Sequence, residues 1–191
     1  MIHVCTASTR DDFQGIRQLQ ELNLRRNLSE SEIMSEGFVT AEYSVDFLAK
    51  MSTFYPAAIA KTENGTIIGY ALIVSKQLQG DHALLDDMIE VIDKISLQDK
   101  DKSIPFKSLP YVLCGQLCVA IGYRGKGLVT DLYNCLRRVV QMSTPEVRYV
   151  FTEVAHDNKR SLRAHEKCGF KVIQTHTFGA TGFDIILWDW T

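Results

Sequence analysis

The sequence has little net charge, no long apolar run and no start typical of an exported protein. Its 191 residues include 21 basic and 23 acidic ones, for a formal net charge of −2. This balance offers no overall attraction for nucleic acid or an anionic membrane. No apolar run approaches the ~18 residues that a membrane-spanning helix needs. Residues 1–5 lack the basic start and apolar core of a signal peptide. We therefore expect neither nucleic acid nor a membrane as a partner.

The cysteines form no recognisable pattern. There are five, an odd number, and no two of them stand as a Cys-x-x-Cys pair. This spacing indicates neither a disulfide framework nor a zinc site, so we expect no metal. A reducing compartment is the simpler interpretation, and we expect a cytoplasmic protein.

The apolar fraction of 46% is ordinary for a globular protein, and the length predicts one domain over residues 1–191. Strand-like runs lie at residues 2–6, 57–62, 66–76, 108–119, 148–155, 171–178 and 183–190. Helical spacing lies at residues 9–22, 44–55, 82–97, 128–142 and 158–168. Hairpins at both ends with strand–helix–strand units between them predict an α/β (α+β) fold, a mixed sheet with helices on both faces.

Residues 78–108 interrupt the predicted sheet. They contain a helical stripe of apolar residues, with acidic residues on the other side. The stripe fits packing on the domain, covering a cleft or meeting a second subunit, and the pattern does not separate these. The acidic side fits either attraction of a cationic amine or simple solvation.

A short basic turn, residues 124–129 (Arg-Gly-Lys-Gly-Leu-Val), follows the apolar run at 111–119 and opens a helix. A strand, a glycine-rich turn and a helix in this order direct backbone N–H groups and a helix N-terminus at one place. That arrangement predicts an anion site, most often for a phosphate. The alternative is an ordinary turn with solvated charges.

A second segment lies downstream of this turn, and the two segments together make a specific signal of function. The turn resembles the first motif of the GNAT superfamily of acetyl-CoA-dependent N-acetyltransferases, Arg/Gln-x-x-Gly-x-Gly/Ala. Asn158, Ser161, His165, Gly169 and Phe170 keep every spacing of that family's second motif, Asn-x-x-Ala-x-x-x-Tyr-x-x-x-Gly-Phe. The resemblance covers nearly the whole chain and implies a mixed, mostly antiparallel seven-stranded sheet.

Four features depart from the family pattern. Val129 replaces a small residue, Ser161 replaces Ala, and His165 replaces the Tyr of the second motif. The segment 78–108 is also longer than the turn usual there, which indicates a helical insertion.

The resemblance implies acetyl-CoA as acyl donor. The residues that would bind it are Leu117, Cys118, Val119, Arg124, Gly125, Lys126, Gly127, Leu128, Val129, Asn158 and Ser161. The turn would hold the pyrophosphate through backbone N–H groups, and the strand residues before it would offer a backbone N–H to the acyl oxygen. The strand side chains equally suit the core, and Asn158 equally suits a helix N-cap. Cys118 reads as a buried hydrophobic residue rather than a nucleophile.

Glu153 is the candidate general base. The ribosomal-protein alanine N-acetyltransferases of that superfamily carry a Glu at the same offset before the second motif. Partial burial would raise the pKa of Glu153 toward neutrality, which suits a base. The other reading is a salt bridge or an exposed edge position. His165 could donate a proton to the leaving thiolate in place of the Tyr, or could only pack.

The pattern therefore predicts an enzyme that moves the acetyl group of acetyl-CoA to a primary amine by direct attack in a ternary complex. The alternative is an acyl-CoA-binding sensor or interaction module without turnover. The acceptor, whether a small-molecule or a peptide amine, stays open. Residues 36–40 and the helix at 82–97 match its side of the family fold. Family members are often dimers, so the resemblance leaves a homodimer open.

Overall fold

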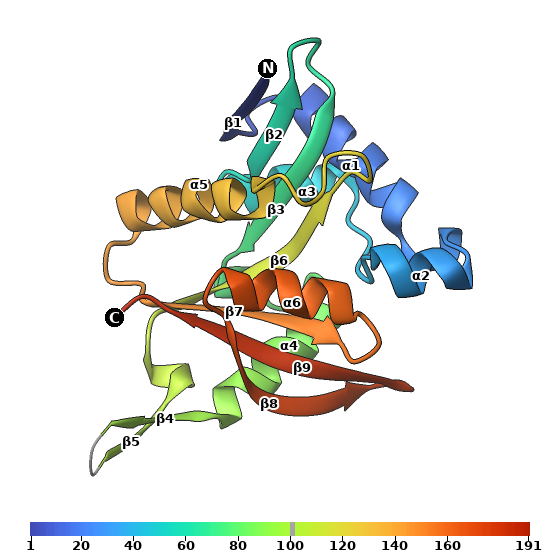
Figure 1. The fold of residues 1–191 in the computed structure, drawn as a ribbon. Helices are drawn as coiled ribbons and strands as arrows, with labels where there is room; N and C mark the ends of the chain where they lie inside the picture. The colour runs from blue at the N-terminus through green and yellow to red at the C-terminus, as the bar shows by residue number, and fades with distance from the viewer. Residues whose placement is uncertain (100–101) are drawn as a thin grey trace.

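The structure is a computed structural model that describes residues 1–99 and 102–191. Within this part of the chain, one seven-stranded sheet has the order β1-β2-β3-β6-β7-β9-β8 (Figure 1). Its strands are β1 (Ile2–Thr6), β2 (Ala58–Thr62), β3 (Ile67–Val74), β6 (Tyr111–Val119), β7 (Tyr149–Ala155), β8 (Lys171–Phe178) and β9 (Thr181–Asp189). Only β6 and β7 pair in parallel; all neighbouring pairs besides are antiparallel. The predicted mixed, mostly antiparallel sheet is confirmed.

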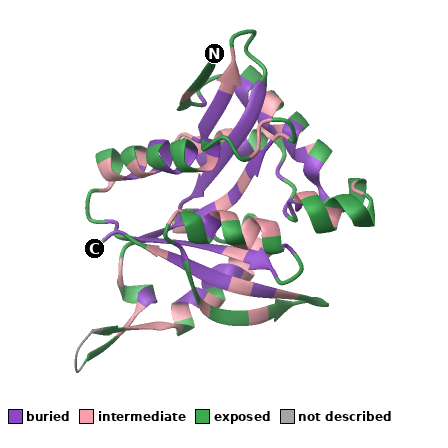
Figure 2. Ribbon diagram, viewed as in Figure 1, coloured by how far each residue is buried: buried purple, intermediate pink, exposed green. Residues whose placement is uncertain are grey.

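Helices cover both faces of this sheet. One face carries α1 (Arg10–Asn23), α3 (Val45–Ser52) and α4 (Ala83–Lys94), and the other carries α5 (Leu128–Ser143) and α6 (Lys159–Lys167). Tyr70 and Leu72 of β3 enter the first apolar core, whereas Ala71 and Ile73 enter the second. Because both faces of β3 are covered, its sequence is a continuous apolar run, and the strand is buried along its length (Figure 2).

Short polar residues begin the helices as the sequence indicates. Thr9 and Asp12 form a capping box at α1, and Ser44 accepts the Phe47 N–H at the start of α3. The sequence interpretation missed α2 (Glu30–Glu36), which begins at a second capping box of Ser29 and Glu32. Its residues lack a buried face, so hydrophobic spacing did not reveal it. In the described residues, three single-turn 3₁₀ helices lie at Arg25–Asn27, Lys76–Leu78 and Phe106–Ser108.

The insertion packs on the domain, which decides one alternative that the sequence left open. The apolar stripe of α4, including Met88, Ile89 and Ile92, is buried in the first core. Three of its acidic residues, Asp86, Asp87 and Asp93, have partners: Asp93 accepts from Lys76 and from the Tyr111 hydroxyl. The helix continues into a small hairpin of β4 (Ser96–Asp99) and β5 (Lys102–Pro105), which the sequence interpretation did not include.

The centre of the sheet opens into a V. The parallel strands β6 and β7 pair only from Tyr111 to Leu113, opposite Tyr149 to Phe151. Beyond these residues they diverge, as Figure 1 shows. The pairing of β6 with β3 shifts between Gln116 and Cys114, which leaves Gly115 as a bulge. The bulge of β6 therefore lies at Gly115, between Cys114 and Gln116. None of the described helices is long and apolar enough to cross a membrane.

Candidate active site

The glycine-rich turn lies at the open end of β6 and leads into α5. Gly125 and Gly127 have φ of 75° and 83°, values that strain any residue with a Cβ atom. A Cβ at either position would meet no described atom within 4 Å, so the space in front of the turn is open. Gly127 is the N-cap of α5 and supplies no side-chain cap. The first N–H groups of α5 are therefore available to an anion.

A cleft of about 490 Å³ lies in front of this turn. The predicted donor-binding residues that line it are Leu117, Cys118, Val119, Arg124, Gly125, Gly127, Leu128, Val129, Asn158 and Ser161. Lys126 is not among the lining residues. Its ammonium donates to the Gly122 carbonyl at 2.9 Å and lies 5.3 Å from the Tyr123 ring centroid.

The backbone of β6 presents two N–H groups to the V. The Ala120 N–H donates to the Ile68 carbonyl of β3. Because backbone polar groups alternate along a strand, the N–H groups of Val119 and Leu117 point the other way, toward the opening. The Cys118 N–H points toward β3, and burial raises the pKa of its thiol to about 12. Cys118 is therefore a neutral thiol and not a reactive thiolate.

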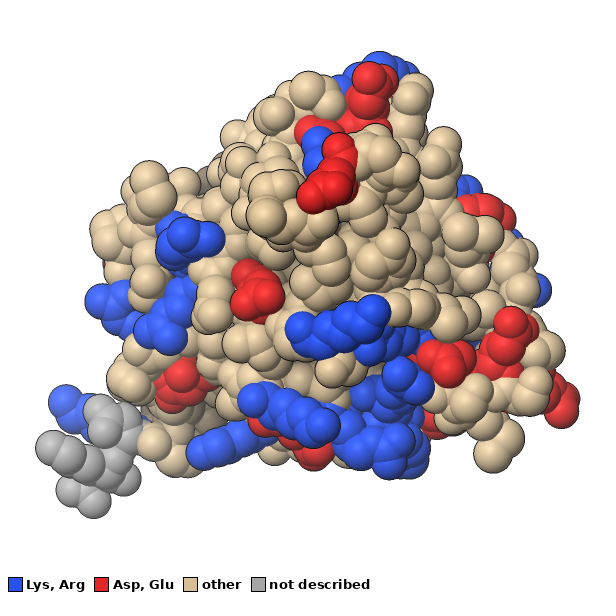
Figure 3. All heavy atoms as spheres, turned by 45° about the horizontal axis from the view of Figure 1, so that its top comes forward, with Lys and Arg blue, Asp and Glu red and all other residues tan. Residues whose placement is uncertain are grey.

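Basic side chains gather at the rim of the cleft. Arg160, Arg163 and Lys167 all come from α6 and line the cleft. Figure 3 shows Lys and Arg side chains grouped on the lower part of one face of the molecule. A local positive rim of this kind attracts a phosphorylated ligand despite the overall charge of −2.

Arg124 holds the site together from within. Its guanidinium donates to the Val119 carbonyl at 2.7 Å, to the backbone and side chain of Glu36 at 2.6 and 2.7 Å, and to Asn23 at 2.8 Å. The side chain is only 15% exposed. It therefore ties the turn to α1 and α2, a role that the turn pattern did not reveal.

Asn158 is an N-cap, as one of its two readings held. Its Oδ1 accepts from the Ser161 N–H at 3.3 Å, and its Nδ2 donates to the Phe38 carbonyl at 2.7 Å. Gly37 lies against it with φ of 74°, and a Cβ there would come within 2.7 Å of Oδ1. This contact fixes residues 37–38 beside α6. A direct contact of Asn158 with the donor stays a prediction.

A second, smaller cavity of about 60 Å³ lies deeper in the V. It is lined by Glu153 from β7, His165 from α6, Phe38, Leu84, Phe183 and others. Leu117 lines both this cavity and the larger cleft, so the two meet at β6. The structure therefore brings Glu153 and His165 together beside the donor cleft.

Glu153 is buried, and one of its two carboxylate oxygens has a hydrogen-bond partner among the described residues. Its side chain is 8% exposed, and its Oε2 lies 3.0 Å from Nε2 of His176. Its Oε1 has no hydrogen-bond partner among the described residues. Burial raises the pKa of the carboxyl group, while the bond to His176 opposes that shift. Of the alternatives to a base role, the exposed edge is excluded, whereas a salt bridge is present, with His176 as the partner; Oε1 is left without a partner among the described residues.

His165 is a neutral imidazole. Its Nδ1 lies 2.8 Å from the Ser161 carbonyl, which only accepts, so Nδ1 carries the proton. Burial lowers the pKa of His165 to about 4. Proton donation by an imidazolium at neutral pH, the role considered from the sequence, does not fit this environment. Nε2 is buried and finds no partner in the described part of the chain.

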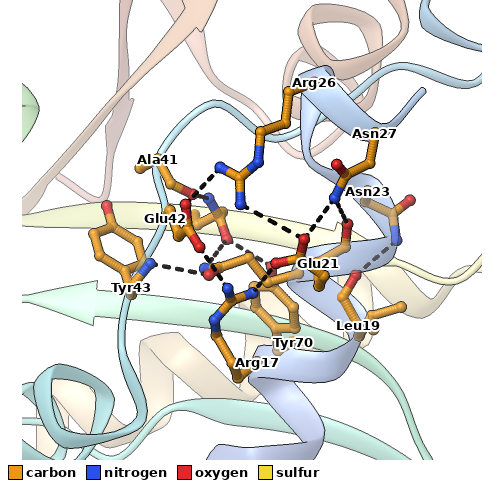
Figure 4. A network of polar contacts seen from close by, with 12 residues as sticks. Arg17, Leu19, Glu21, Asn23, Arg26, Asn27, Ala41, Glu42, Tyr43 and Tyr70 are labelled. Atoms are coloured by element: carbon orange, nitrogen blue, oxygen red, sulfur yellow. Dashed lines mark hydrogen bonds and ion pairs between the residues drawn. The ribbon is translucent and has the colours of Figure 1, made fainter. Parts of the chain in front are cut away.

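A polar network that the sequence did not indicate positions the segment beside this cavity. Gln116 donates to the Ala41 carbonyl at 2.8 Å and accepts from Gln20 and from the Tyr70 hydroxyl at 2.8 and 2.6 Å. Gln20 in turn accepts from the Tyr43 N–H at 2.9 Å. Figure 4 shows an outer layer of arginine–glutamate pairs over this network. Residues 41–43 are thereby fixed to α1 and β6.

The residues of this site suit acyl transfer by backbone and side-chain groups. Across residues 1–99 and 102–191, no three His, Cys, Asp or Glu side chains gather in an arrangement that would hold a metal ion. The splayed parallel pair beside a helix N-terminus agrees with the class of acyl-CoA-dependent transferases that the two sequence motifs resemble.

Comparison with known proteins agrees with that class. A family profile described as the acetyltransferase (GNAT) family matches residues 22–170. The ribosomal-protein-S18-alanine N-acetyltransferase of Escherichia coli is 14% identical with a TM-score of 0.61, over 100% of this chain and 95% of that one. NAA60 of Arabidopsis thaliana, solved with acetyl-CoA, is 15% identical with a TM-score of 0.62, over 99% of each chain. Ard1 of Thermoplasma volcanium is 11% identical with a TM-score of 0.64, over 100% and 98%. At these identities the likeness concerns the fold, and no curated protein sequence matches.

The chain belongs to the acetyltransferase (GNAT) family. It is an N-acetyltransferase, and acetyl-CoA is the acyl donor of that family.

Proposed function

We propose that the protein transfers the acetyl group to a primary amine by direct attack within a ternary complex. The observation that carries the proposal is a pair of cavity-lining residues, each with a buried acceptor that has no partner among the described residues. Glu153 Oε1 and His165 Nε2 both lack a partner among the described residues, and both residues line the cavity that adjoins the donor cleft. A buried acceptor without a donor is costly, so the cavity favours a group that brings at least two N–H donors.

A primary amine is such a group. A neutral primary amine offers two N–H donors and an ammonium three, whereas a hydroxyl offers one. The cavity of about 60 Å³ admits the nitrogen and the first atoms attached to it, so the remainder of the acceptor lies outside. This size fits both a small-molecule amine and the amine of a peptide.

The donor cleft supports the other half of the reaction. Bound acetyl-CoA supplies a thioester, which the amine converts into an amide with release of the CoA thiol. The open space at Gly125 and Gly127, the start of α5 and the basic rim of α6 fit its phosphates. The N–H groups of Leu117 and Val119 fit the oxygen on which negative charge develops during attack.

Glu153 manages the proton. As the C–N bond forms and the C–S bond breaks, one amine proton passes to Oε1 of Glu153 and then to solvent. The thiolate takes its proton from solvent, so a dedicated acid is not required. His165 accepts a second N–H through Nε2 and orients the nitrogen.

The Glu153→Gln variant tests this function. It keeps the side-chain shape but removes the base, so we expect kcat to fall by about 10²–10⁴-fold with acetyl-CoA affinity unchanged. Stopped-flow measurement of CoA release across a panel of amines, with calorimetry for acetyl-CoA, gives both quantities. Glu90→Gln, which removes an exposed carboxylate from α4, is the matched control.

The alternative, a sensor or interaction module that binds acyl-CoA without turnover, makes the opposite forecast. Acetyl-CoA would bind tightly, and no amine would release CoA. A homodimer, the absence of nucleic-acid binding and a cytoplasmic location stay predictions.

A further inference from the structure

The carboxylate of Glu153 contacts His176 of β8, and His176 in turn contacts Asp87 of the insertion helix α4. We infer that His176 and Asp87 are positioning residues for Glu153: the His176 imidazolium, held by Asp87, orients the Glu153 carboxylate and keeps it ionised. This inference rests on the proposed role of Glu153 as the base. It gives the insertion helix a part in the reaction.

The geometry joins three elements. His176 Nε2 lies 3.0 Å from Glu153 Oε2, and His176 Nδ1 lies 3.2 Å from Asp87 Oδ2. The first contact is a hydrogen bond; the second is an ion pair without hydrogen-bond alignment. The side chains of Glu153 and His176 are 8% and 10% exposed, and that of Asp87 is 30% exposed. The contacts from Glu153 through His176 to Asp87 therefore lead from the cavity outward to a partly exposed carboxylate.

The sheet itself brings the pair together. Strand β9 lies between β7 and β8, so Glu153 and His176 reach toward each other across it. Phe183 of β9 pairs with His176 in register and stacks on its ring at 5.7 Å. This stacking holds the plane of the imidazole, and α4 lies over the same face of the sheet. Three points thus fix the ring: Glu153, Asp87 and Phe183.

The charges of the chain support one another. A lone carboxylate at the burial of Glu153 favours its protonated form, which has no use as a base. The hydrogen bond that His176 donates to Glu153 raises the pKa of His176 against the effect of burial, and Asp87 adds to the rise. With both ring nitrogens facing carboxylates, the imidazolium is favoured near neutral pH. Its charge in turn opposes protonation of Glu153, an effect larger than the opposite effect of the Asp87 carboxylate on the pKa of Glu153.

The other titratable groups around Glu153 are neutral. His165 from α6 has a pKa lowered by burial, and burial raises the pKa of Tyr43, on the segment before α3, well above its usual range. The charge that Glu153 meets in the described residues therefore comes from His176 and Asp87. Because His176 holds Oε2, the lone pairs of Oε1 are left for the cavity.

Titration of His176 by NMR tests the contacts of His176 with Glu153 and Asp87 without substrate or turnover. With labelled histidine, we expect the His176 midpoint to lie above the ordinary value of about 6.5 in the wild type. Asp87→Asn should lower it by about one pH unit, and Glu153→Gln should lower it further, because the Glu153 contact is closer and more buried. Glu90→Gln, on the same helix, should leave it unchanged. A wild-type midpoint at or below 6.5, or no shift in Asp87→Asn, overturns the chain.

The pH profile of kcat/KM separates positioning from mere support of the fold. In His176→Gln, Glu153 loses its cation, so its pKa rises and the acid limb should move to higher pH by about one unit. Acetyl-CoA affinity should not change. An equal loss of rate at every pH would overturn the inference. Wild-type turnover of Glu153→Gln would instead overturn the proposed function, and the contacts of His176 and Asp87 would then have no catalytic role. An unshifted His176 titration is a different result, because it overturns only the inference about His176 and Asp87.

Discussion

The proposed donor cleft in front of the turn at residues 124–127 and the proposed acceptor cavity, which Glu153 and His165 line, meet at β6 but are built in different ways. The donor cleft is made mainly by backbone groups: the turn at residues 124–127, the start of α5 and the strand before it. The acceptor cavity is made by buried side chains from β7, α6 and the segment at residues 38–41, backed by β8 and α4. Backbone N–H groups bind an anion whatever the neighbouring side chains are, whereas proton transfer needs particular side chains at particular distances.

Because of that difference, we expect substitutions in the two regions to act through different physical effects. In the donor cleft, the residues that matter are those that let the backbone adopt its shape. In the acceptor cavity, they are the charged groups and whatever sets their protonation. Variants that act on one region alone therefore test whether the division is real.

The largest effect is expected at the turn itself. Gly127→Glu combines the strain of a Cβ at φ of 83° with a carboxylate where phosphate would bind. We expect acetyl-CoA affinity to fall about a thousandfold, or about 4 kcal/mol, measured by calorimetry. Gly65→Glu is the control, because Gly65 also has positive φ, at 84°, and open space around it but lies in the β2–β3 hairpin. A similar loss in both variants would point to unfolding and not to the site.

Arg124 ties the turn of the donor cleft to β6, α1 and α2, so its removal should affect both the stability of the fold and donor binding. Arg124→Gln loses bonds to Val119, Glu36 and Asn23 from a largely buried position. We expect about 3 kcal/mol less stability in urea unfolding, with weaker acetyl-CoA binding. Arg148→Gln, at an exposed arginine, should change stability by less than about 0.5 kcal/mol. Unaltered stability of Arg124→Gln would mean that the turn holds its shape alone.

His165 should make the acceptor cavity sensitive to acid. Its folded pKa of about 4 lies below its ordinary value, so it stabilises the protein above about pH 6.5 and loses that contribution as pH falls toward 4. We expect the wild type to lose about 2 kcal/mol more than His165→Leu between pH 7 and pH 5. Thermal or urea unfolding across this range measures it, with His3→Gln, at an exposed histidine, as control. Parallel curves for the wild type and His165→Leu would place His165 in contact with water.

The smallest effect is expected at the rim of the donor cleft. Arg163 is exposed there, so Arg163→Gln should weaken acetyl-CoA binding by about fivefold, or about 1 kcal/mol, and the loss should vanish at high salt. Lys171→Gln, which removes an exposed charge just beyond α6, should change the affinity little. A salt-independent loss would show that Arg163 acts through packing.

The sequence located the turn and the helix starts around the cleft, because these parts are contiguous; that they bind the donor stays a prediction. Thr9, Ser44 and Asn158 marked helix starts, and the turn glycines marked a backbone of unusual φ. It predicted little about how Arg124 is used, since its partners Asn23 and Glu36 are 101 and 88 residues away in the chain. Helix α2 was missed because its signal lay in caps and not in apolar spacing.

The sequence by itself determined the seven strands of the main sheet, five of the helices, the glycine-rich turn and the family, because each rests on local spacing. Only the tertiary structure decided which side chains surround Glu153. Residues 87, 153 and 176 come from three elements, and nothing in their local sequence indicates that they meet. Burial and charge, which set the protonation of a carboxylate, are properties of that assembled environment and not of any one segment.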